Sequence, residues 1–121
     1  MIASADPRVL VAPGHARNAD GELSIGGVDA RELAGAYGTP LVVFDASVFE
    51  RNLAEFVAAA RPHRIAVAYA AKAFFVVALA RRLAAHADDD VELDVCSLGE
   101  IVTAERGGFP AARMYLHGCG K

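Results

Sequence analysis

The feature that most constrains the fold is a regular alternation of short apolar runs and amphipathic segments between residues 65 and 117. The apolar runs have the length and composition of buried strands; they are IAVAYA at 65–70, VELDV at 91–95 and MYLH at 114–117. The segments between them, 74–86 and 97–107, have the residue spacing of amphipathic helices. Strands joined by single helices through short links form right-handed βαβ units with parallel strands, so the sequence predicts an α/β fold. The alternation alone is compatible with a closed barrel and with an open sheet.

The residues before this alternation are less regular. We expect a loose arm over 1–21, a short strand and turn at 22–28, and a short helix at 29–37 that ends before Gly38. The run LVVFD at 41–45 has the compact apolar pattern of a buried strand.

Two serines have the spacing of a capping box, in which Ser and Glu side chains bond backbone N–H groups at a helix start. Ser47 with Glu50 predicts that a helix begins at Ser47, and Ser97 with Glu100 predicts a second start. The apolar face of the first of these helices is expected to consist of Phe49, Leu53, Phe56, Val57 and Ala60.

Composition excludes several classes of protein. Hydrophobic residues make up 55% of the 121 residues and charged residues 22%, which excludes a disordered chain. A formal net charge of -3 gives no indication of a nucleic acid or an anionic membrane as partner. No apolar run is long enough to span a bilayer and no signal peptide is visible, so we expect a cytoplasmic protein.

No metal site is expected. Cys96 and Cys119 do not form a CxxC pair, so we expect reduced, inert thiols, at least one of them in a strand. The acidic run 88–90 is expected to be a solvated loop, and Arg81 and Arg82 a solvated helix face.

Polar residues stand at or near the carboxyl ends of the three strands of the alternation. Lys72, Asp94 and His117 are separated by about one βα unit each, and strand parity assigns them to one face. Catalytic residues of parallel α/β enzymes lie at this edge, where partial desolvation would free a lysine amine. The alternatives are a solvated rim lysine, a carboxylate that caps the helix at 97, and a buried histidine bonded to backbone.

Several strings resemble those of one enzyme family, the fold-type III pyridoxal-phosphate decarboxylases. YAAKAF (69–74) resembles the YAxKA motif around the lysine that forms a Schiff base with the cofactor, and LDVCSLGE (93–100) resembles LDVxSxGE. HGCGK (117–121) resembles HGNxK, although Cys119 replaces the usual Asn and puts any contact of that side chain in doubt. IGGVD (25–29) and YGTPLVVFD (37–45) are similar to diaminopimelate decarboxylases in particular, so that the likeness covers about residues 22–121.

The resemblance implies a particular domain organisation. Residues 47–121 would be the first part of a pyridoxal-phosphate-binding (β/α)8 TIM barrel, and 22–46 a segment of a β-rich second domain, so that LVVFD would not be a barrel strand. The chain would then be part of a longer protein, and the isolated chain would be inactive because its barrel cannot close.

The resemblance also implies a function, the decarboxylation of meso-2,6-diaminopimelate to L-lysine and CO2 by a homodimer. Lys72 would be the catalytic and cofactor-binding lysine, with Asp94 and His117 as further cofactor-binding residues. The alternatives are an arginine, ornithine or carboxynorspermidine decarboxylase of the same fold, or an inactive cofactor-binding fragment. Segments that would choose the substrate side chain are not among these strings.

Overall fold

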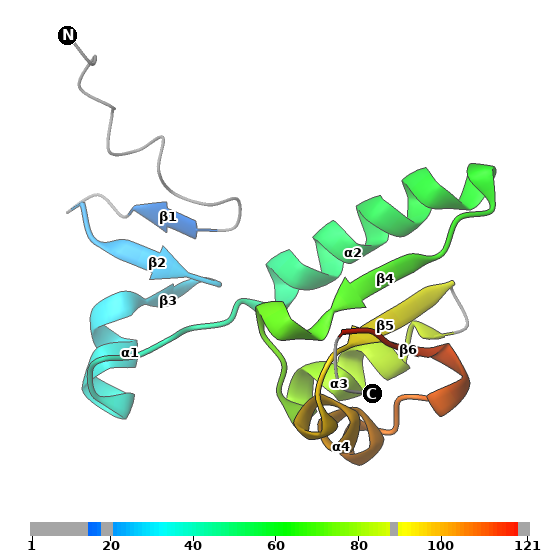
Figure 1. Cartoon of the computed structure of the whole chain (residues 1–121). Helices are drawn as coiled ribbons and strands as arrows, with labels where there is room; N and C mark the ends of the chain where they lie inside the picture. The colour runs from blue at the N-terminus through cyan, green and yellow to red at the C-terminus, as the bar shows by residue number, and fades with distance from the viewer. Residues whose placement is uncertain (1–14, 18–20, 88–89, 119–121) are drawn as a thin grey trace, which may run out of the picture. The chain divides into compact units, whose positions relative to one another are not determined.

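The computed structural model describes residues 15–17, 21–87 and 90–118. The chain forms two compact units, one up to Leu53 and the other from Ala54 onward (Figure 1). The long helix α2, Ala46–Ala60, runs from the first unit into the second.

The first unit contains a small antiparallel sheet of order β1-β2-β3. Its strands are β1 His15–Arg17, β2 Leu23–Ile25 and β3 Val28–Asp29. Gly26 and Gly27 join β2 to β3 with φ of 58° and 83°, a left-handed pair that suits the twist of a tight hairpin. Helix α1, Ala30–Tyr37, follows at once, because the Asp29 side chain accepts a hydrogen bond from the Arg31 N–H at 2.7 Å.

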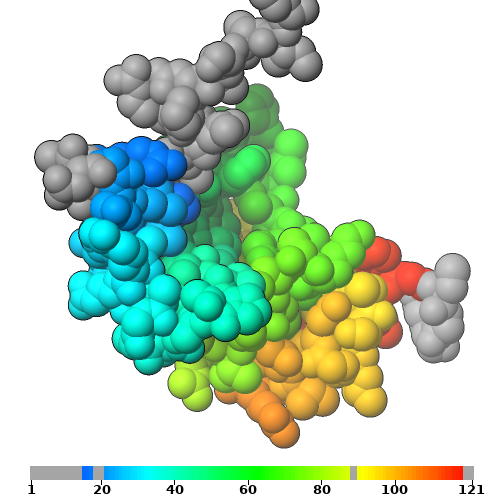
Figure 2. Space-filling model, turned by 90° about the vertical axis from the view of Figure 1, so that its left-hand side faces the viewer, coloured from blue at the N-terminus to red at the C-terminus, as the bar shows by residue number. Residues whose placement is uncertain are grey.

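Two expectations for this unit are wrong. His15–Arg17 was expected to belong to a loose arm, but it pairs with β2. Residues 41–45 were expected from their pattern to form a buried strand, but they form no strand, and Val42 is 85% exposed. No strand in the described ranges pairs with them, and the segment after α1 lies at the surface (Figure 2).

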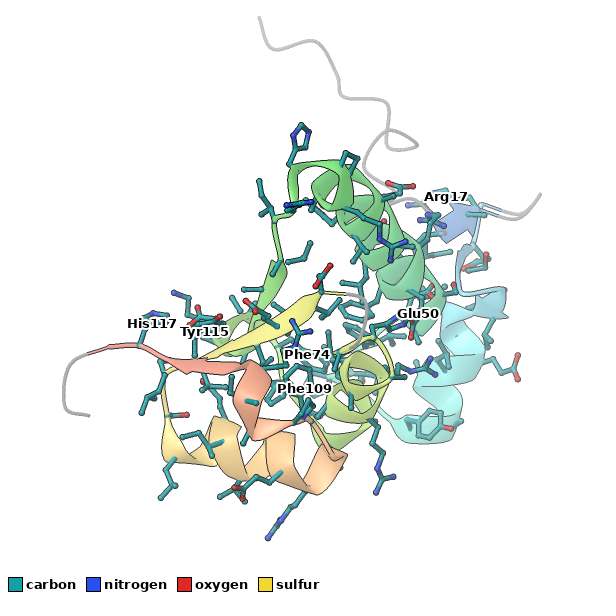
Figure 3. The ribbon with its side chains drawn as sticks, turned by 90° about the vertical axis from the view of Figure 1, so that its right-hand side faces the viewer. Arg17, Glu50, Phe74, Phe109, Tyr115 and His117 are labelled. Atoms are coloured by element: carbon teal, nitrogen blue, oxygen red, sulfur yellow. The ribbon has the colours of Figure 1, made fainter. Side chains whose placement is uncertain are left out.

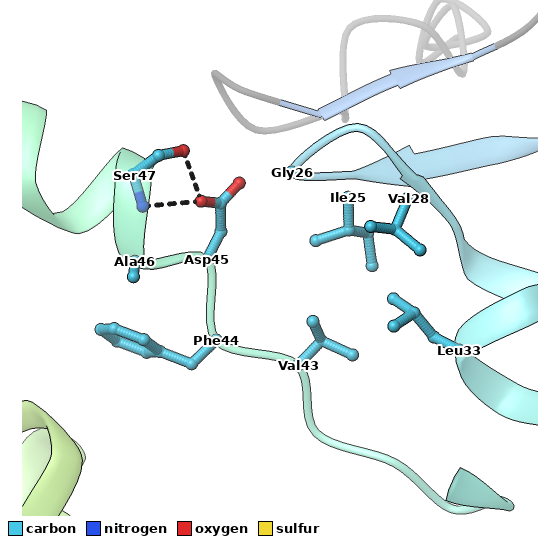
Figure 4. Close-up of a pocket in the computed structure, with 9 residues that line it drawn as sticks. All are labelled: Ile25, Gly26, Val28, Leu33, Val43, Phe44, Asp45, Ala46 and Ser47. Carbon is cyan, nitrogen blue, oxygen red and sulfur yellow. Dashed lines mark hydrogen bonds between the residues drawn. The ribbon is translucent and has the colours of Figure 1, made fainter. Parts of the chain in front are cut away.

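Helix α2 is capped by Asp45 and not, as expected, by Ser47. One oxygen of the Asp45 carboxylate, Oδ1, accepts the N–H group of Ser47 at 2.9 Å (Figure 4). The same oxygen accepts the N–H group of Val48 at 3.2 Å. The Ser47 hydroxyl donates to the same oxygen at 2.6 Å, so it supports the cap instead of providing it. The apolar face predicted for this helix is only partly buried, since Leu53 is enclosed and Phe56 is 67% exposed.

The second unit confirms the predicted alternation. Its sheet is parallel in the order β4-β5-β6 and is connected through α3 and α4 (Figure 1). The bounds are β4 Val67–Ala70, α3 Val77–Ala84, β5 Val91–Val95, α4 Leu98–Gly107 and β6 Met114–Leu116. Short 3-10 turns lie at η1 Arg61–His63, η2 Ala71–Ala73 and η4 Ala111–Arg113. Helix α3 starts three residues later than predicted, because Phe74 and Val76 are extended.

The core of the second unit lies on one face of β5. Val91, Leu93 and Val95 are at most 1% exposed, and α3 and α4 pack against each other. Buried residues of the two helices and one residue after α4 complete the core; they are Leu79, Ala80, Leu83, Ala104 and Phe109.

Close packing of α3 and α4 depends on Gly107. A Cβ on this residue would lie 2.3 Å from the Ala80 Cβ and 2.9 Å from the Ala80 carbonyl carbon. A methyl group does not fit there unless one helix shifts.

Helix α4 begins as the sequence predicts. The Ser97 hydroxyl accepts the Glu100 N–H at 3.3 Å, and the Glu100 carboxylate accepts the Cys96 N–H at 2.7 Å. The helix ends at Gly108, which has a φ of 78° that a side chain would strain. Among the described residues, no helix has both the length and the hydropathy needed to cross a bilayer.

We predict that Gly107→Ala destabilises the second unit by about 1–3 kcal/mol, because the added methyl overpacks the contact with Ala80. Urea unfolding of the purified protein measures the effect. Gly99→Ala is the matched control, since no atom lies closer than 4.0 Å to its added Cβ. Helix propensity makes that change neutral or stabilising by up to about 1 kcal/mol. Equal unfolding midpoints for the two variants would contradict the close contact between Gly107 and Ala80.

Candidate active site

The carboxyl edge of the β4-β5-β6 sheet carries the residues predicted to do chemistry. Lys72 lies in the turn η2 that follows β4, Asp94 lies near the end of β5, and His117 follows β6 directly. Because the strands are parallel, their carboxyl ends share one edge of the sheet.

Asp94 and His117 form a side-chain pair. The Nδ1 atom of His117 is hydrogen-bonded to Oδ1 of Asp94, and the backbone N–H of His117 donates to the Val95 carbonyl at 3.0 Å. Two alternatives from the sequence are therefore wrong: Ser97 caps α4 in place of Asp94, and the exposed His117 ring bonds a carboxylate instead of backbone. The labelled ring of His117 lies at the end of β6 in Figure 3.

Lys72 is exposed among the described residues. The partial burial that we expected for its amine is therefore not observed there. Its strand, β4, ends at Ala70, and strand parity therefore does not extend to the lysine. The Lys72 cation lowers the pKa of the Cys96 thiol and the Asp94 carboxylate raises it, so both charged groups act on the same thiol. The amine thus lies within electrostatic range of the end of β5.

Cys96 belongs to this edge, which the expectation of an inert thiol in a strand did not anticipate. The residue is exposed and follows β5, and its thiol donates to a Glu100 oxygen at 3.7 Å. Partial desolvation raises the pKa of the Cys96 thiol, as do the hydrogen bond and charge of Glu100, while the Lys72 cation lowers it. The sequence could have indicated this position, because Cys96 lies two residues after Asp94 and so falls on the same face of an alternating strand.

The turn that carries Lys72 is closed by Tyr69, which sequence reasoning missed. The Tyr69 hydroxyl donates to the Phe74 carbonyl at 2.7 Å, and burial raises the pKa of this phenol. The rings of Tyr69 and Phe75 are 6.5 Å apart. The hydrogen bond therefore connects the end of β4 to the residue two positions after the lysine.

A second polar pair lies one step further from the carboxyl edge. The Tyr115 hydroxyl donates to Oε1 of Glu92 at 3.2 Å, and Arg113 lies 3.7 Å from the same oxygen. Tyr115 and His117 both project from the β6 segment (Figure 3). The sheet face opposite the core thus carries two cross-strand side-chain contacts.

A pocket of about 300 Å³ lies within the first unit and is lined by none of the predicted site residues (Figure 4). Its lining consists of Ile25, Gly26, Val28, Leu33, Val43, Phe44, Asp45, Ala46 and Ser47. The Asp45 carboxylate caps α2 through Oδ1, and these contacts lower its pKa. The second oxygen, Oδ2, is buried and has no hydrogen-bond partner among the described residues.

Some expectations fall outside the described ranges. Cys119, Asp88 and Asp89 are among the residues not described. Asp90 is described and lies 3.9 Å from Arg113. Within those ranges, His, Cys, Asp and Glu side chains do not gather into a group able to hold a metal ion.

Comparison with known proteins gives consistent names. No protein-family model matches the chain. A diaminopimelate decarboxylase of Bacillus subtilis is 42% identical over 107 residues, which are 87% of this chain and 24% of that protein. The diaminopimelate decarboxylase of Mycobacterium tuberculosis is 39% identical over 105 residues, 87% of this chain and 23% of that protein.

Solved structures agree with these relatives. The crystal structure of a diaminopimelate decarboxylase from M. jannaschi matches with a TM-score of 0.77 and 31% identity, over 87% of this chain and 25% of that one. A protein from Aquifex aeolicus matches with a TM-score of 0.73 and 34% identity, over 91% and 26%. The chain spans about a quarter of the length of the relatives it matches.

We predict that Glu100→Gln accelerates alkylation of Cys96 by iodoacetamide about threefold near pH 8, because it removes a charge that raises the thiol pKa. Lys72→Ala should have the opposite effect, since it removes the cation that lowers the same pKa. Peptide mass spectrometry as a function of pH measures the rate at Cys96 separately from Cys119. Identical rate profiles in the three proteins would refute this electrostatic coupling.

Proposed function

We propose that this chain is part of an enzyme of the diaminopimelate decarboxylase family, which converts meso-2,6-diaminopimelate to L-lysine and CO2. The observation that carries the proposal is the match to proteins of that name over 87% of the chain. An arginine, ornithine or carboxynorspermidine decarboxylase is not favoured, because the curated relatives described above carry a different name.

We propose that residues 47–121 form the first part of a TIM barrel and that 22–46 belong to a β-rich second domain. The parallel order β4-β5-β6 supports the barrel, as does the division into a core face and a polar face. In such a barrel the polar face, with Asp94 and Glu92, would point inward. The small antiparallel sheet of the first unit supports the second assignment. By the same family resemblance, the longer protein would be a cytoplasmic homodimer.

The residues at the carboxyl edge suit pyridoxal 5'-phosphate. Lys72 offers an exposed primary amine, the group that binds the cofactor aldehyde covalently. Asp94 and His117 offer a carboxylate and an imidazole that hold each other in place. When bound, the cofactor supplies the electron sink for the bond that breaks at the substrate carboxylate.

Each residue of this chain then has a separate task. The Lys72 amine would hold the cofactor covalently through Nζ. Asp94 Oδ1 holds Nδ1 of His117 and so orients the imidazole at the same edge. We infer that this pair borders the cofactor and fixes its position.

We predict that Lys72→Ala reduces release of CO2 from meso-diaminopimelate by the full-length protein to the background rate, because the covalent attachment point is lost. Radiometric or coupled CO2 assays measure the rate. In the unmodified protein, borohydride reduction in the presence of pyridoxal phosphate should label Lys72.

The second lysine of the chain, Lys121, is an internal reference for the labelling. Label on Lys121 but not on Lys72 would refute the assignment of the lysine. Decarboxylation of arginine or ornithine, but not of meso-diaminopimelate, would refute the substrate while leaving the cofactor assignment intact.

We predict that Asp94→Asn weakens binding of pyridoxal phosphate about tenfold, since a hydrogen bond to a charged group contributes about 1.5–3 kcal/mol. Titration of the full-length protein with the cofactor, followed by absorbance, measures the Kd. Glu92→Gln is the matched control, because Glu92 lies on the same strand and face but contacts Tyr115 and Arg113 instead. An equal loss of affinity in both variants would assign Asp94 a general role in the sheet and not a cofactor contact.

A further inference from the structure

The hydrogen bond between Tyr69 and Phe74 spans the residue proposed to bind the cofactor. Tyr69 lies in β4 and Phe74 lies beyond η2, and the distance from the hydroxyl oxygen to the carbonyl oxygen is 2.7 Å. Lys72 lies between these two anchor points. The turn that carries Lys72 is therefore closed by a side chain of β4, the strand that precedes the turn.

The contact supports a short stretch of backbone around Lys72. A single 3-10 turn has poor internal hydrogen-bond geometry and little intrinsic stability. Phe74 leaves the turn in an extended conformation, with φ -170° and ψ 122°, so its carbonyl is not part of a continuing helix. The Tyr69 hydroxyl provides a hydrogen-bond partner for this carbonyl.

Both sides of the turn are anchored while the lysine is exposed. Ala71, immediately before Lys72, is 2% exposed and packs in the interior. After the lysine, the backbone is held at Phe74, and the ring of Phe75 lies 6.5 Å from that of Tyr69 at an angle of 36°. Tyr69 thus contacts the chain after Lys72 through both its hydroxyl and its ring.

We propose that Tyr69 is a positioning residue, whose hydroxyl fixes the direction in which the Lys72 side chain leaves the sheet edge. This inference rests on the proposed function, in which the Lys72 amine attacks the cofactor aldehyde. Attachment joins Nζ to the aldehyde carbon and releases the aldehyde oxygen as water. Tyr69 takes no part in that exchange of bonds, and it acts only by holding the backbone that carries the amine.

Removal of one oxygen atom tests the proposal. Tyr69→Phe retains the ring and its position beside Phe75 but eliminates the hydrogen bond to the Phe74 carbonyl. Tyr115→Phe is the matched control, because it makes the same chemical change in β6, where the hydroxyl bonds Glu92. Both variants are made in the full-length protein, and urea midpoints establish that each is folded.

Two measurements follow. The first is the rate at which Lys72 captures pyridoxal phosphate, by stopped-flow absorbance, with the labelled residue identified after borohydride reduction. The second is amide hydrogen exchange of residues 70–76 without cofactor. Tyr69→Phe should slow capture about tenfold, because the amine is no longer held in its attacking direction, and should speed exchange in the turn. Tyr115→Phe should remain within about twofold of the unmodified protein in both.

The outcomes separate this inference from the proposed function. Capture by Tyr69→Phe at the rate of the unmodified protein overturns the positioning role, even where the urea midpoint falls, because a purely structural contact changes stability and not capture. Equal slowing in both Tyr→Phe variants also overturns it. Failure of the unmodified protein to capture pyridoxal phosphate at Lys72 overturns the proposed function, and the positioning role with it.

Discussion

Burial of one face of β5 is the constraint on which the second unit depends. Val91, Leu93 and Val95 are enclosed by the paired helices α3 and α4, whose close approach requires a residue without a side chain at Gly107. Because side chains alternate along a strand, burial of these three positions places the intervening residues on the opposite face. The apolar residues of β5 thus determine where Asp94 lies, although none of them contributes to its chemistry.

The short strand β6 is tied to β5 by polar contacts on that opposite face. In the backbone register Tyr115 pairs with Asp94, yet its hydroxyl reaches Glu92. His117 follows two residues later and reaches Asp94 in the same way. Both side chains therefore lean by the same two-residue offset toward the start of β5. Such cross-strand pairs contribute about 0.2–1 kcal/mol each, so their main effect is orientation.

The sequence predicted those parts of the structure in which a local pattern and a tertiary contact agree. Strand β5 was predicted to the residue, because its alternation matches its two-faced environment. The run at 41–45 was misassigned because apolar composition does not reveal whether a pairing strand is present. Asp45 and Ser47 are both good caps two positions apart, and pattern alone does not distinguish them. The strand before Lys72 was predicted to end at Ala70, as it does, but nothing in YAAKAF indicated the 3-10 turn at 71–73 that interrupts the side-chain alternation before the lysine.

Exposure of Lys72 changes the explanation for its proposed reactivity. Desolvation activates a lysine only where the amine is removed from water, and this amine is not removed from water within the described residues. The Asp94 carboxylate is engaged with His117, so its charge acts at the edge as part of a pair. What this segment provides to Lys72 is therefore mainly geometry: a turn anchored by the buried Ala71 on one side and by the Tyr69–Phe74 hydrogen bond on the other. With the backbone already held, only the lysine side chain has to be ordered when the amine reacts, and that saving in conformational entropy favours capture.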